Sequence, residues 1–526
     1  MLAFYDTETT GLGENFTQIL QIGWLFTDGD LNIRSSKKSN CRNSPWELPS
    51  PEALLTTGFT PHDLKTSKNS NFEMMQEVNG WLRSHRKPLI FIGYNSLGFD
   101  EPVMAQNFYQ NLLPPGLTTS KISANGQSNG RADVMRMVQM ALLYMPGALK
   151  LDILNYYGTP SMTLKNVARQ NGVALPDSDA HDALNDIRAT VGVARVIQKT
   201  APQIWDQSIK LATLDGVNKF LDDHDIFTFA SFMYGKPRVS SVMTSLAENE
   251  GDSTTQALFD LRTDPARYMT MTVDELKNVF LSNNDNPFVM VRKDEQPVLM
   301  PMELSDPVLK PEDDIALYKK RAEAIKTDKA FLANVAKAAL LASQEQLAAA
   351  PALSEPETMI NKEVPAPVQA KLDAWAKEFR EAETWHDRAV LANGFSARFK
   401  DELAADPTLQ RYEEFATRLV FENAKDELTA AQQLDMNKFI AARILNDDFR
   451  VPYMTIAKAR AELEKIEKYR TDPRWKDVTT DEIATLKKYY TSLETLYAPY
   501  VPSYDIKEHR KEHRSVKPRD AALCCC

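Results

Sequence analysis

The sequence predicts an α/β domain with a mixed sheet flanked by helices, followed by a small β-rich domain and an all-α C-terminal domain. Strand-like and helix-like segments alternate over the first 200 residues. Short strand-like segments then prevail from about residue 205 to 310, and helical patterns fill most of the chain up to about residue 500. At 526 residues the chain is too long for one hydrophobic core. We therefore expect domains over 1–200, 201–355 and 356–503, and a charged, disordered tail over 504–526.

In the first domain, apolar and aromatic runs predict strands over 2–6, 18–28 and 87–95. Thr60, Pro61 and Asp63 stand in the order of an N-cap, a first-turn proline and a capping box, which predicts a helix start. Apolar residues at helical spacing predict further helices over 99–113, 131–145, 163–173 and 180–199. This alternation is typical of a sheet covered by helices.

The second domain shows strand-like segments over 226–235, 254–261, 286–293 and 296–302. Thr272 and Glu275 form a capping-box pattern that predicts one helix among these strands. We expect a small β-barrel with an inserted helix. The Ala-rich segment 331–350 is predicted to form a helix. The Pro-rich segment 351–368 is the best candidate for a linker to the helical domain.

Composition excludes several classes of protein. The chain is 43% hydrophobic and 25% charged, which is ordinary for a folded globular protein. It has no apolar run of the roughly 20 residues that a membrane span needs and no signal-peptide pattern, so we expect a cytoplasmic protein without membrane contact. Cys41 stands alone and the other cysteines end the chain, which rules out a disulfide framework or a zinc spacing. The net charge of −10 argues against nonspecific coating of nucleic acid but leaves room for a locally basic groove.

Acidic residues recur at three places in the first domain. Asp6 and Glu8 are two apart on a predicted strand, so both side chains face the same side, where their charges repel. Magnesium prefers such oxygen ligands and would relieve the repulsion. Asp100 begins a predicted helix after a buried strand, and His181 precedes Asp186 by five residues near another helix start.

Each of these features also has a plain structural explanation. Alternating acids occur on solvent-exposed strands, Asp100 could be only an N-cap, and His181 and Asp186 could lie on a solvated helix face. Their joint occurrence in this order favours a metal-dependent site.

These residues carry a resemblance to a known family. The patterns D-x-E (Asp6, Glu8), N-x-x-x-F-D (Asn95, Phe99, Asp100) and H-x-x-x-x-D (His181, Asp186) resemble the three motifs of the DEDDh exonuclease superfamily, which has a ribonuclease-H-like fold. More closely, segments 93–111, 131–138 and 171–197 resemble the bacterial exodeoxyribonuclease I family. The similarity extends over 259–280 and 291–302 to that family's SH3-like domain, and faintly through 391–395 to its helical domain.

The resemblance implies two-metal hydrolysis. Asp6, Glu8, Asp100 and Asp186 would hold two Mg²⁺ ions, with Mn²⁺ as a substitute, and His181 would take the proton of the attacking water. Residues expected to contact the substrate are Glu8, Thr9, Leu12, Asn95, Phe99 and Lys165. Leu12 would wedge against the terminal base or be an ordinary buried leucine. The family carries a basic residue where this chain has Thr163, so a phosphate contact there depends on Lys165.

The family degrades single-stranded DNA in the 3′→5′ direction to 5′-mononucleotides in DNA repair and recombination, and it docks the acidic C-terminal tail of single-stranded-DNA-binding protein. The resemblance implies the same for this chain, which we expect to be a monomer. Candidates for a stacking and basic channel between the domains are Tyr94, Phe108, Tyr109, Tyr144, Lys236 and Arg238. Two alternatives are a proofreading or RNA-trimming DEDDh exonuclease and a non-catalytic single-stranded nucleic-acid-binding protein.

Overall fold

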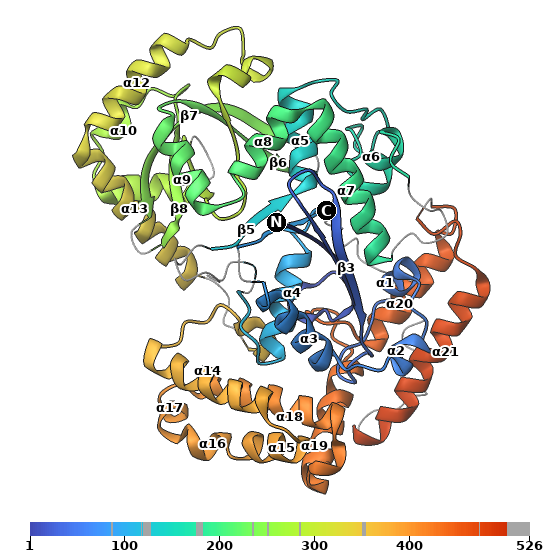
Figure 1. Ribbon diagram of the computed structural model, residues 1–526. Coiled ribbons are helices and arrows are strands. Elements are labelled where there is room, and N and C mark those ends of the chain that lie inside the picture. Colours follow the sequence, from blue (N-terminus) through green and yellow to red (C-terminus); the bar gives the residue numbers. More distant parts are fainter. Residues whose placement is uncertain are drawn as a thin grey trace.

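Two five-stranded sheets and a C-terminal set of helices make up the structure, a computed structural model (Figure 1). It describes residues 1–85, 88–116, 118, 128–174, 182–233, 236–249, 252–282, 286–349, 354–472 and 474–501. In Figure 1 the first sheet is central, the second sheet and its helices lie on one side, and the C-terminal helices border the other. Within these ranges no helix is long and apolar enough to cross a membrane.

The first sheet has the strand order β3-β2-β1-β4-β5. β1 pairs antiparallel with β2 and parallel with β4, so the mixed sheet predicted from the sequence is confirmed. β3 was not expected, because its residues are polar and mostly exposed and give no apolar pattern. The bounds are β1 (Leu2–Thr9), β2 (Ile19–Thr27), β3 (Ile33–Asn40), β4 (Ile90–Gly93) and β5 (Gly130–Asp133).

Helices cover both faces of this sheet: α1 (Pro51–Thr57), α2 (Asp63–Thr66), α3 (Asn71–Arg83), α4 (Asp100–Gln110), α5 (Val134–Tyr144), α6 (Leu164–Gln170) and α7 (Ala183–Thr200). Thr60 and Asp63 exchange the expected capping-box hydrogen bonds, although the helix begins at Asp63. One expectation was wrong: residues 131–133 belong to β5 and not to the following helix. There Asp133 caps α5 by accepting a bond from the Met135 N–H.

Two further helices, α8 (Pro202–Lys210) and α9 (Leu214–Asp223), precede the second sheet. The strand-rich region was expected to begin at about residue 205, and it begins only at β6. All pairings in this sheet are antiparallel, in the order β10-β6-β7-β8-β9. Its strands are β6 (Phe227–Met233), β7 (Lys236–Asn249), β8 (Asp252–Asp260), β9 (Phe288–Arg292) and β10 (Val298–Pro301).

Four helices accompany the second sheet: α10 (Ala266–Met269), α11 (Val273–Leu281), α12 (Ile315–Thr327) and α13 (Lys329–Ala348). The capping box of Thr272 and Glu275 at the start of α11 is confirmed. Short 3₁₀ turns η2 (Met302–Leu304) and η3 (Asp306–Val308) follow β10. The helices share a core with the inner face of the sheet, built around Phe259, Leu276 and Phe331.

The C-terminal region is helical, as predicted. It opens with the 3₁₀ turn η4 (Pro356–Met359), inside the expected linker, and continues as α14 (Ala366–Glu381), α15 (Trp385–Asn393), α16 (Phe395–Arg398), α17 (Lys400–Ala405), α18 (Arg411–Asn423), α19 (Ala430–Ile444), α20 (Ile456–Lys468) and α21 (Thr480–Tyr497). The expected tail over 504–526 lies outside the described residues.

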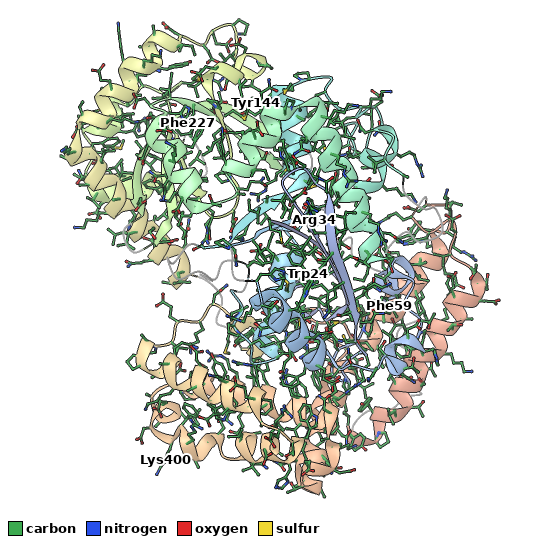
Figure 2. All side chains as sticks on the ribbon, in the orientation of Figure 1. Trp24, Arg34, Phe59, Tyr144, Phe227 and Lys400 are labelled. Atoms are coloured by element: carbon green, nitrogen blue, oxygen red, sulfur yellow. The ribbon has the colours of Figure 1, made fainter. Side chains whose placement is uncertain are left out.

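The C-terminal helices share one hydrophobic core with the first region. Leu20, Phe72 and Tyr109 pack in the same cluster as Trp375 and Phe415. Burial of this size holds the two regions together, since each large apolar side chain removed from water contributes about 1.5–3 kcal/mol. Figure 2 shows Trp24 in the central sheet and Phe227 in the second sheet, both fully buried, and Lys400 on the outer surface.

Candidate active site

Three of the predicted acids meet at one end of β1. Carboxylate oxygens of Asp6, Glu8 and Asp186 all lie within 4.8 Å of one another. Glu8 is buried, and Asp6 and Asp186 are half-buried. The alternation of β1 puts Asp6 and Glu8 on the same face, as the sequence indicated, and α7 supplies Asp186 from above that face.

A glycine lets α7 approach this closely. Gly23 on β2 is the pairing partner of Asp6. A Cβ at Gly23 would lie 2.7 Å from the Cδ1 of Ile187 and 3.1 Å from the backbone carbon of Ala183, so only glycine fits under the first turn of α7. The Ala183 N–H also donates to the Gln21 side chain at 2.9 Å, which fixes the helix start on the sheet.

Asp100 joins the acids from the first turn of α4. Its Oδ1 accepts hydrogen bonds from the Thr7 N–H at 3.1 Å and from the Thr7 hydroxyl at 2.6 Å. These two bonds attach Asp100 to β1 at the residue between Asp6 and Glu8, and Asp100 lies close enough for its charge to act on both carboxyl groups. The turn before α4 is tight: a Cβ at Gly93 would lie 2.3 Å from the Ser96 Cβ.

Burial and nearby negative charges raise the pKa of every carboxyl group in the cluster. Burial raises the pKa of Asp6 well above its usual value, and the charges of Asp100 and Glu8 add to the effect. Burial and the charge of Asp186 raise the pKa of Glu8 to about 9. Burial raises the pKa of Asp100 to about 7 against the opposing Thr7 bonds, and burial with the charge of Asp182 raises that of Asp186 to about 6.

Such a cluster fits a divalent cation. Without a counter-charge, four close carboxyl groups cannot all ionise near neutral pH. Hard cations such as Mg²⁺ take carboxylate oxygens as ligands, and a bound cation favours the ionised form of each. The donor set of Asp6, Glu8 and Asp186 therefore suits a metal ion, with Asp100 adjacent.

The predicted substrate residues lie around these acids in different settings. Thr9 is buried, and its hydroxyl donates to the Gly11 carbonyl at 2.9 Å. Leu12 is 80% exposed, which excludes the alternative that it is an ordinary core leucine. Lys165 is exposed on α6, and its positive charge partly offsets the rise that burial and Asp182 cause in the pKa of Asp186. Thr163, the position without a basic side chain, is the exposed N-cap of the same helix.

Asn95 and Phe99 belong to the turn between β4 and α4. Asn95 has a φ of 62°, in the left-handed region that asparagine tolerates better than most residues. Its backbone N–H donates to Asp133 Oδ1 at 2.9 Å. Phe99 is half-buried at the N-cap of α4 and packs against the core of the first sheet.

Three of the aromatic channel candidates are core residues, so their assignment to a channel was wrong. Phe108 packs fully buried between the sheet and its helices. Tyr109 lies in the core shared with the C-terminal helices, and Tyr144 is buried and accepts a hydrogen bond from the Thr228 hydroxyl at 3.1 Å. Helical spacing of aromatic residues cannot distinguish a core face from a ligand face. Tyr94 is half-buried and donates its hydroxyl to the Met162 carbonyl at 2.6 Å.

Three other candidates cannot be placed. His181 lies outside the described residues, as do the side chains of Lys236 and Arg238 on β7.

An open groove leads from the turn before Asp100 toward the second sheet. Asn95 and Gly98 line its near end. Its wall combines cationic, acidic and apolar side chains, among them Arg136, Arg292, Glu295, Phe229 and Phe232. Aromatic faces and guanidinium groups are the side chains that bind single-stranded nucleic acids.

Sequence reasoning missed three residues that shape the site. Thr7 binds Asp100, Asp133 binds the turn before it, and Asp182 caps α7 while pairing with Lys38 at 2.6 Å. Asp182 immediately precedes the first turn of α7, so its N-cap position could have been found from the sequence. The roles of Thr7 and Asp133 depend on contacts with residues far away in the chain.

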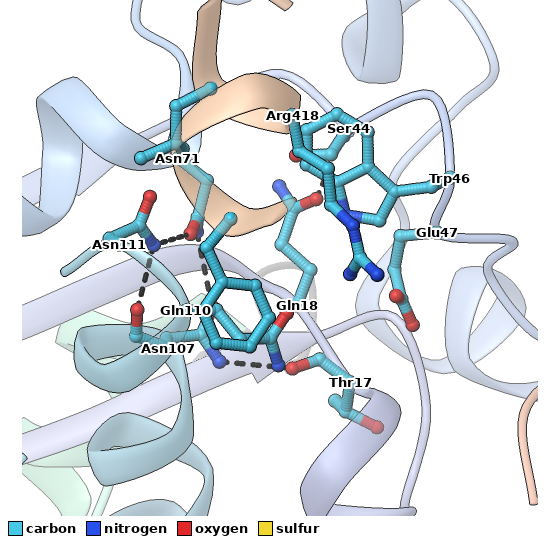
Figure 3. Close-up of a pocket in the computed structure, with 12 residues that line it drawn as sticks. Thr17, Gln18, Ser44, Trp46, Glu47, Asn71, Asn107, Gln110, Asn111 and Arg418 are labelled. Carbon is cyan, nitrogen blue, oxygen red and sulfur yellow. Dashed lines mark hydrogen bonds between the residues drawn. The ribbon is translucent and has the colours of Figure 1, made fainter. Parts of the chain in front are cut away.

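A separate polar cavity lies between α4 and α18 (Figure 3). The Asn107 side chain donates to the Thr17 carbonyl at 2.9 Å, and Asn111 donates to the Asn71 side chain at 2.5 Å. Figure 3 shows these amides on one side and Arg418 from α18 opposite. They tie α4 to the segment before β2 and to α3, and thus support the helix that carries Asp100.

Comparisons with known proteins agree with this geometry. Residues 3–194 match the exonuclease family RNase T. A stretch of 248 residues, 47% of this chain, is 27% identical to exodeoxyribonuclease I of Buchnera aphidicola subsp. Schizaphis graminum and covers 48% of that protein. A longer stretch of 344 residues, 63% of this chain, is 24% identical to the protein of the same name from Buchnera aphidicola subsp. Acyrthosiphon pisum and covers 80% of it.

Solved structures match the whole architecture. Exonuclease I from Methylocaldum szegediense superposes with a TM-score of 0.70 at 20% identity, over 94% of this chain and 99% of that one. E. coli exonuclease I in complex with a dA16 oligonucleotide gives 0.68 at 18% identity, again over 94% and 99%. An ExoI/SSB-Ct complex gives 0.69 at 17% identity with the same coverage. At these identities the superpositions establish the fold.

The mixed sheet, the acidic cluster and the sequence match define the first region as a DEDD-type exonuclease domain. The second sheet and the helical region extend the similarity over nearly the full chain. The chain is therefore similar to exonuclease I in sequence and in fold, and its match spans about half the length of the first of the relatives described above.

Proposed function

We propose that this chain is a 3′→5′ exonuclease that hydrolyses single-stranded DNA to 5′-mononucleotides, in the service of DNA repair and recombination. The observation that carries this proposal is the convergence of Asp6, Glu8 and Asp186 within 4.8 Å, with Asp100 bound beside them by Thr7. Four carboxyl groups that repel one another when ionised are held close together here. Such a group suits phosphodiester hydrolysis assisted by divalent metal ions.

In this mechanism Asp6, Glu8, Asp100 and Asp186 would hold two Mg²⁺ ions, with Mn²⁺ as a substitute. When bound, the ions supply Lewis acidity toward the attacking water and the leaving 3′ oxygen. His181 takes the proton of the water on an imidazole nitrogen, which its ordinary pKa near neutrality allows. That role rests on its position five residues before Asp186 in the sequence.

The remaining predicted residues would bind the 3′ end. Glu8 and Thr9 stand at the end of β1 where the terminal nucleotide would enter, and the exposed Leu12 is free to wedge against its base. Asn95 and Phe99 border the same turn as Asp100, and Lys165 offers a cation near Asp186 for a phosphate. The DNA strand would leave along the groove toward the second sheet, where Arg136 and Phe232 supply charge and a stacking face.

We propose that the chain divides this work among domains 1–200, 201–355 and 356–503, of which the second is SH3-like. The related exonuclease I has been crystallised with single-stranded oligonucleotides and with SSB-Ct. We infer the same two partners for this chain: single-stranded DNA and the acidic C-terminal tail of single-stranded-DNA-binding protein.

The test is a cleavage assay on 3′-labelled and 5′-labelled single-stranded DNA and RNA, with Mg²⁺ or EDTA. We expect Mg²⁺-dependent release of mononucleotides from 3′ DNA ends, lost in Asp6→Ala and in His181→Ala. A preference for RNA would favour an RNA-trimming exonuclease instead. Binding without cleavage would favour a non-catalytic binding protein, and activity that survives Asp6→Ala would refute the metal site.

A further inference from the structure

The turn between β9 and β10 connects the second sheet to the β5 edge of the first. β5 is an edge strand, and the N–H groups of its residues 131 and 133 point away from β4. The Arg131 N–H donates to the Ala212 carbonyl at 2.7 Å, and the Asp133 N–H donates to Gln296 Oε1 at 2.8 Å. One side-chain amide from the turn after β9 thus binds this edge of the first sheet.

Gln296 is held in place from several sides. It is 1% exposed, and its φ of 46° lies in the left-handed region that favours glycine. Its Nε2 donates to the Ser208 carbonyl at 3.4 Å, and its own carbonyl accepts from Arg136 Nη1 at 3.2 Å. A strained backbone at a buried polar residue persists only when its surroundings impose it, and such strain is common near functional sites.

Asp133 transmits this contact to the turn before Asp100. Its Oδ1 accepts from the Asn95 N–H at 2.9 Å and from the Met135 N–H at 2.8 Å, and its Oδ2 lies 3.4 Å from the Leu97 N–H. One carboxylate therefore binds the turn that leads into α4 and also caps α5. A shift of Asp133 would move the backbone that carries Asp100.

A second residue of the turn 293–297, Asp294, makes a similar contact with β5. Arg131 pairs with Glu101, the residue after Asp100, and also donates to the Asp294 carbonyl at 2.8 Å. The turn 293–297 thus reaches both sides of Asp100 through two routes, one from Gln296 through Asp133 and one from Asp294 through Arg131.

We propose that Gln296 is a positioning residue for the reaction, which acts through Asp133 on the turn 95–97 and so on the placement of Asp100. The inference rests on the proposed function, and it makes the second sheet part of the catalytic arrangement as well as a surface for DNA. Displacing a reacting group by about 1 Å can cost roughly 100-fold in rate.

The test compares Gln296→Met with a matched control, Gln207→Met. Methionine is an unbranched side chain of length similar to glutamine and lacks the amide. Gln207 is also buried, and its Nε2 donates to the Leu299 carbonyl of β10 at 3.0 Å, but it has no contact with Asp133. Asp133→Asn serves as a second variant that keeps the shape of the carboxylate. For each protein, the single-turnover cleavage rate at saturating enzyme with Mg²⁺ and the Kd for the same oligonucleotide in EDTA are measured well below the Tm.

We expect Gln296→Met and Asp133→Asn to lower the single-turnover rate about 10-fold or more at unchanged Kd, and Gln207→Met to leave both at the wild-type values. Equal rates for Gln296→Met and Gln207→Met, or a loss confined to Kd, would overturn the positioning role while the proposed function stands. A wild-type chain that binds DNA but never cleaves it would overturn the proposed function, and this inference with it.

Discussion

Replacement of Asp186 by asparagine should make the metal-free protein more stable. The pKa of this carboxyl is about 6 in the folded chain against an ordinary value of 3.8, because burial and the charge of Asp182 oppose its ionisation. The folded chain therefore holds this proton more tightly than the unfolded chain. This tighter proton binding adds to the free energy of unfolding. Its contribution is fully present below pH 3.8 and is lost as the pH rises through 6.

The magnitude follows from that difference. At about 1.36 kcal/mol per pH unit, ionising Asp186 in the folded chain costs about 3 kcal/mol at pH 8. Asparagine keeps the shape and carries no charge, so Asp186→Asn should recover up to about 3 kcal/mol at pH 8 and almost nothing at pH 4. In EDTA this corresponds to a Tm higher by several degrees.

Thermal melts with EDTA or Mg²⁺ at pH 4, 6 and 8 measure this effect. Mg²⁺ should raise the Tm of the wild-type chain and change that of Asp186→Asn much less, because the variant has lost one ligand. Asp477→Asn, an exposed position, is the control and should leave every melt unchanged. An Asp186→Asn protein no more stable than wild type at pH 8, or one that Mg²⁺ stabilises as much, would refute the account of the acidic cluster.

Three further predictions follow from single contacts. Gly23→Ala places a Cβ 2.7 Å from Ile187, so it should lower stability by about 1–3 kcal/mol in melts and reduce cleavage, whereas Gly29→Ala, in open space, should do neither. Thr7→Val removes a bond that lowers the pKa of Asp100, so the acid limb of the rate profile should move to higher pH; an unmoved limb would contradict this. Glu357→Gln removes the carboxylate that the buried Arg418 and Arg443 share, which leaves only their longer contacts to Glu414 and Glu47; it should cost about 3–5 kcal/mol in urea unfolding, against less than about 1 kcal/mol for the exposed Glu378→Gln.

Local patterns in the sequence were enough to predict the elements that depend on local chemistry. The alternation of Asp6 and Glu8 on β1 and the capping box of Thr272 and Glu275 are both present in the structure. β3 gave no signal, because a polar edge strand lacks the apolar alternation by which strands are recognised. The helices over 202–223 were likewise obscured by the strands that follow them.

Features that depend on distant contacts could not be predicted. Tyr109 occupies a helix face that looks equally suited to a channel, and only the packing of the C-terminal helices against it makes it a core residue. The sequence pattern placed Asp133 inside a predicted helix, yet it caps α5, binds the turn 95–97, and donates its backbone N–H to Gln296, which lies 163 residues away. The chain separation of such partners hides their association from any local pattern.

The two edges of the first sheet are protected in different ways. β3 carries Lys37 and Lys38, and charged side chains on an edge strand discourage pairing with another molecule. β5 is instead covered by later parts of the chain, because its outward N–H groups donate to Ala212 and Gln296. A fragment ending near residue 200 would expose that edge as a template for strand addition. We therefore expect the isolated first region to self-associate, which means that an exonuclease domain of this kind cannot simply be cut free of the rest of the chain.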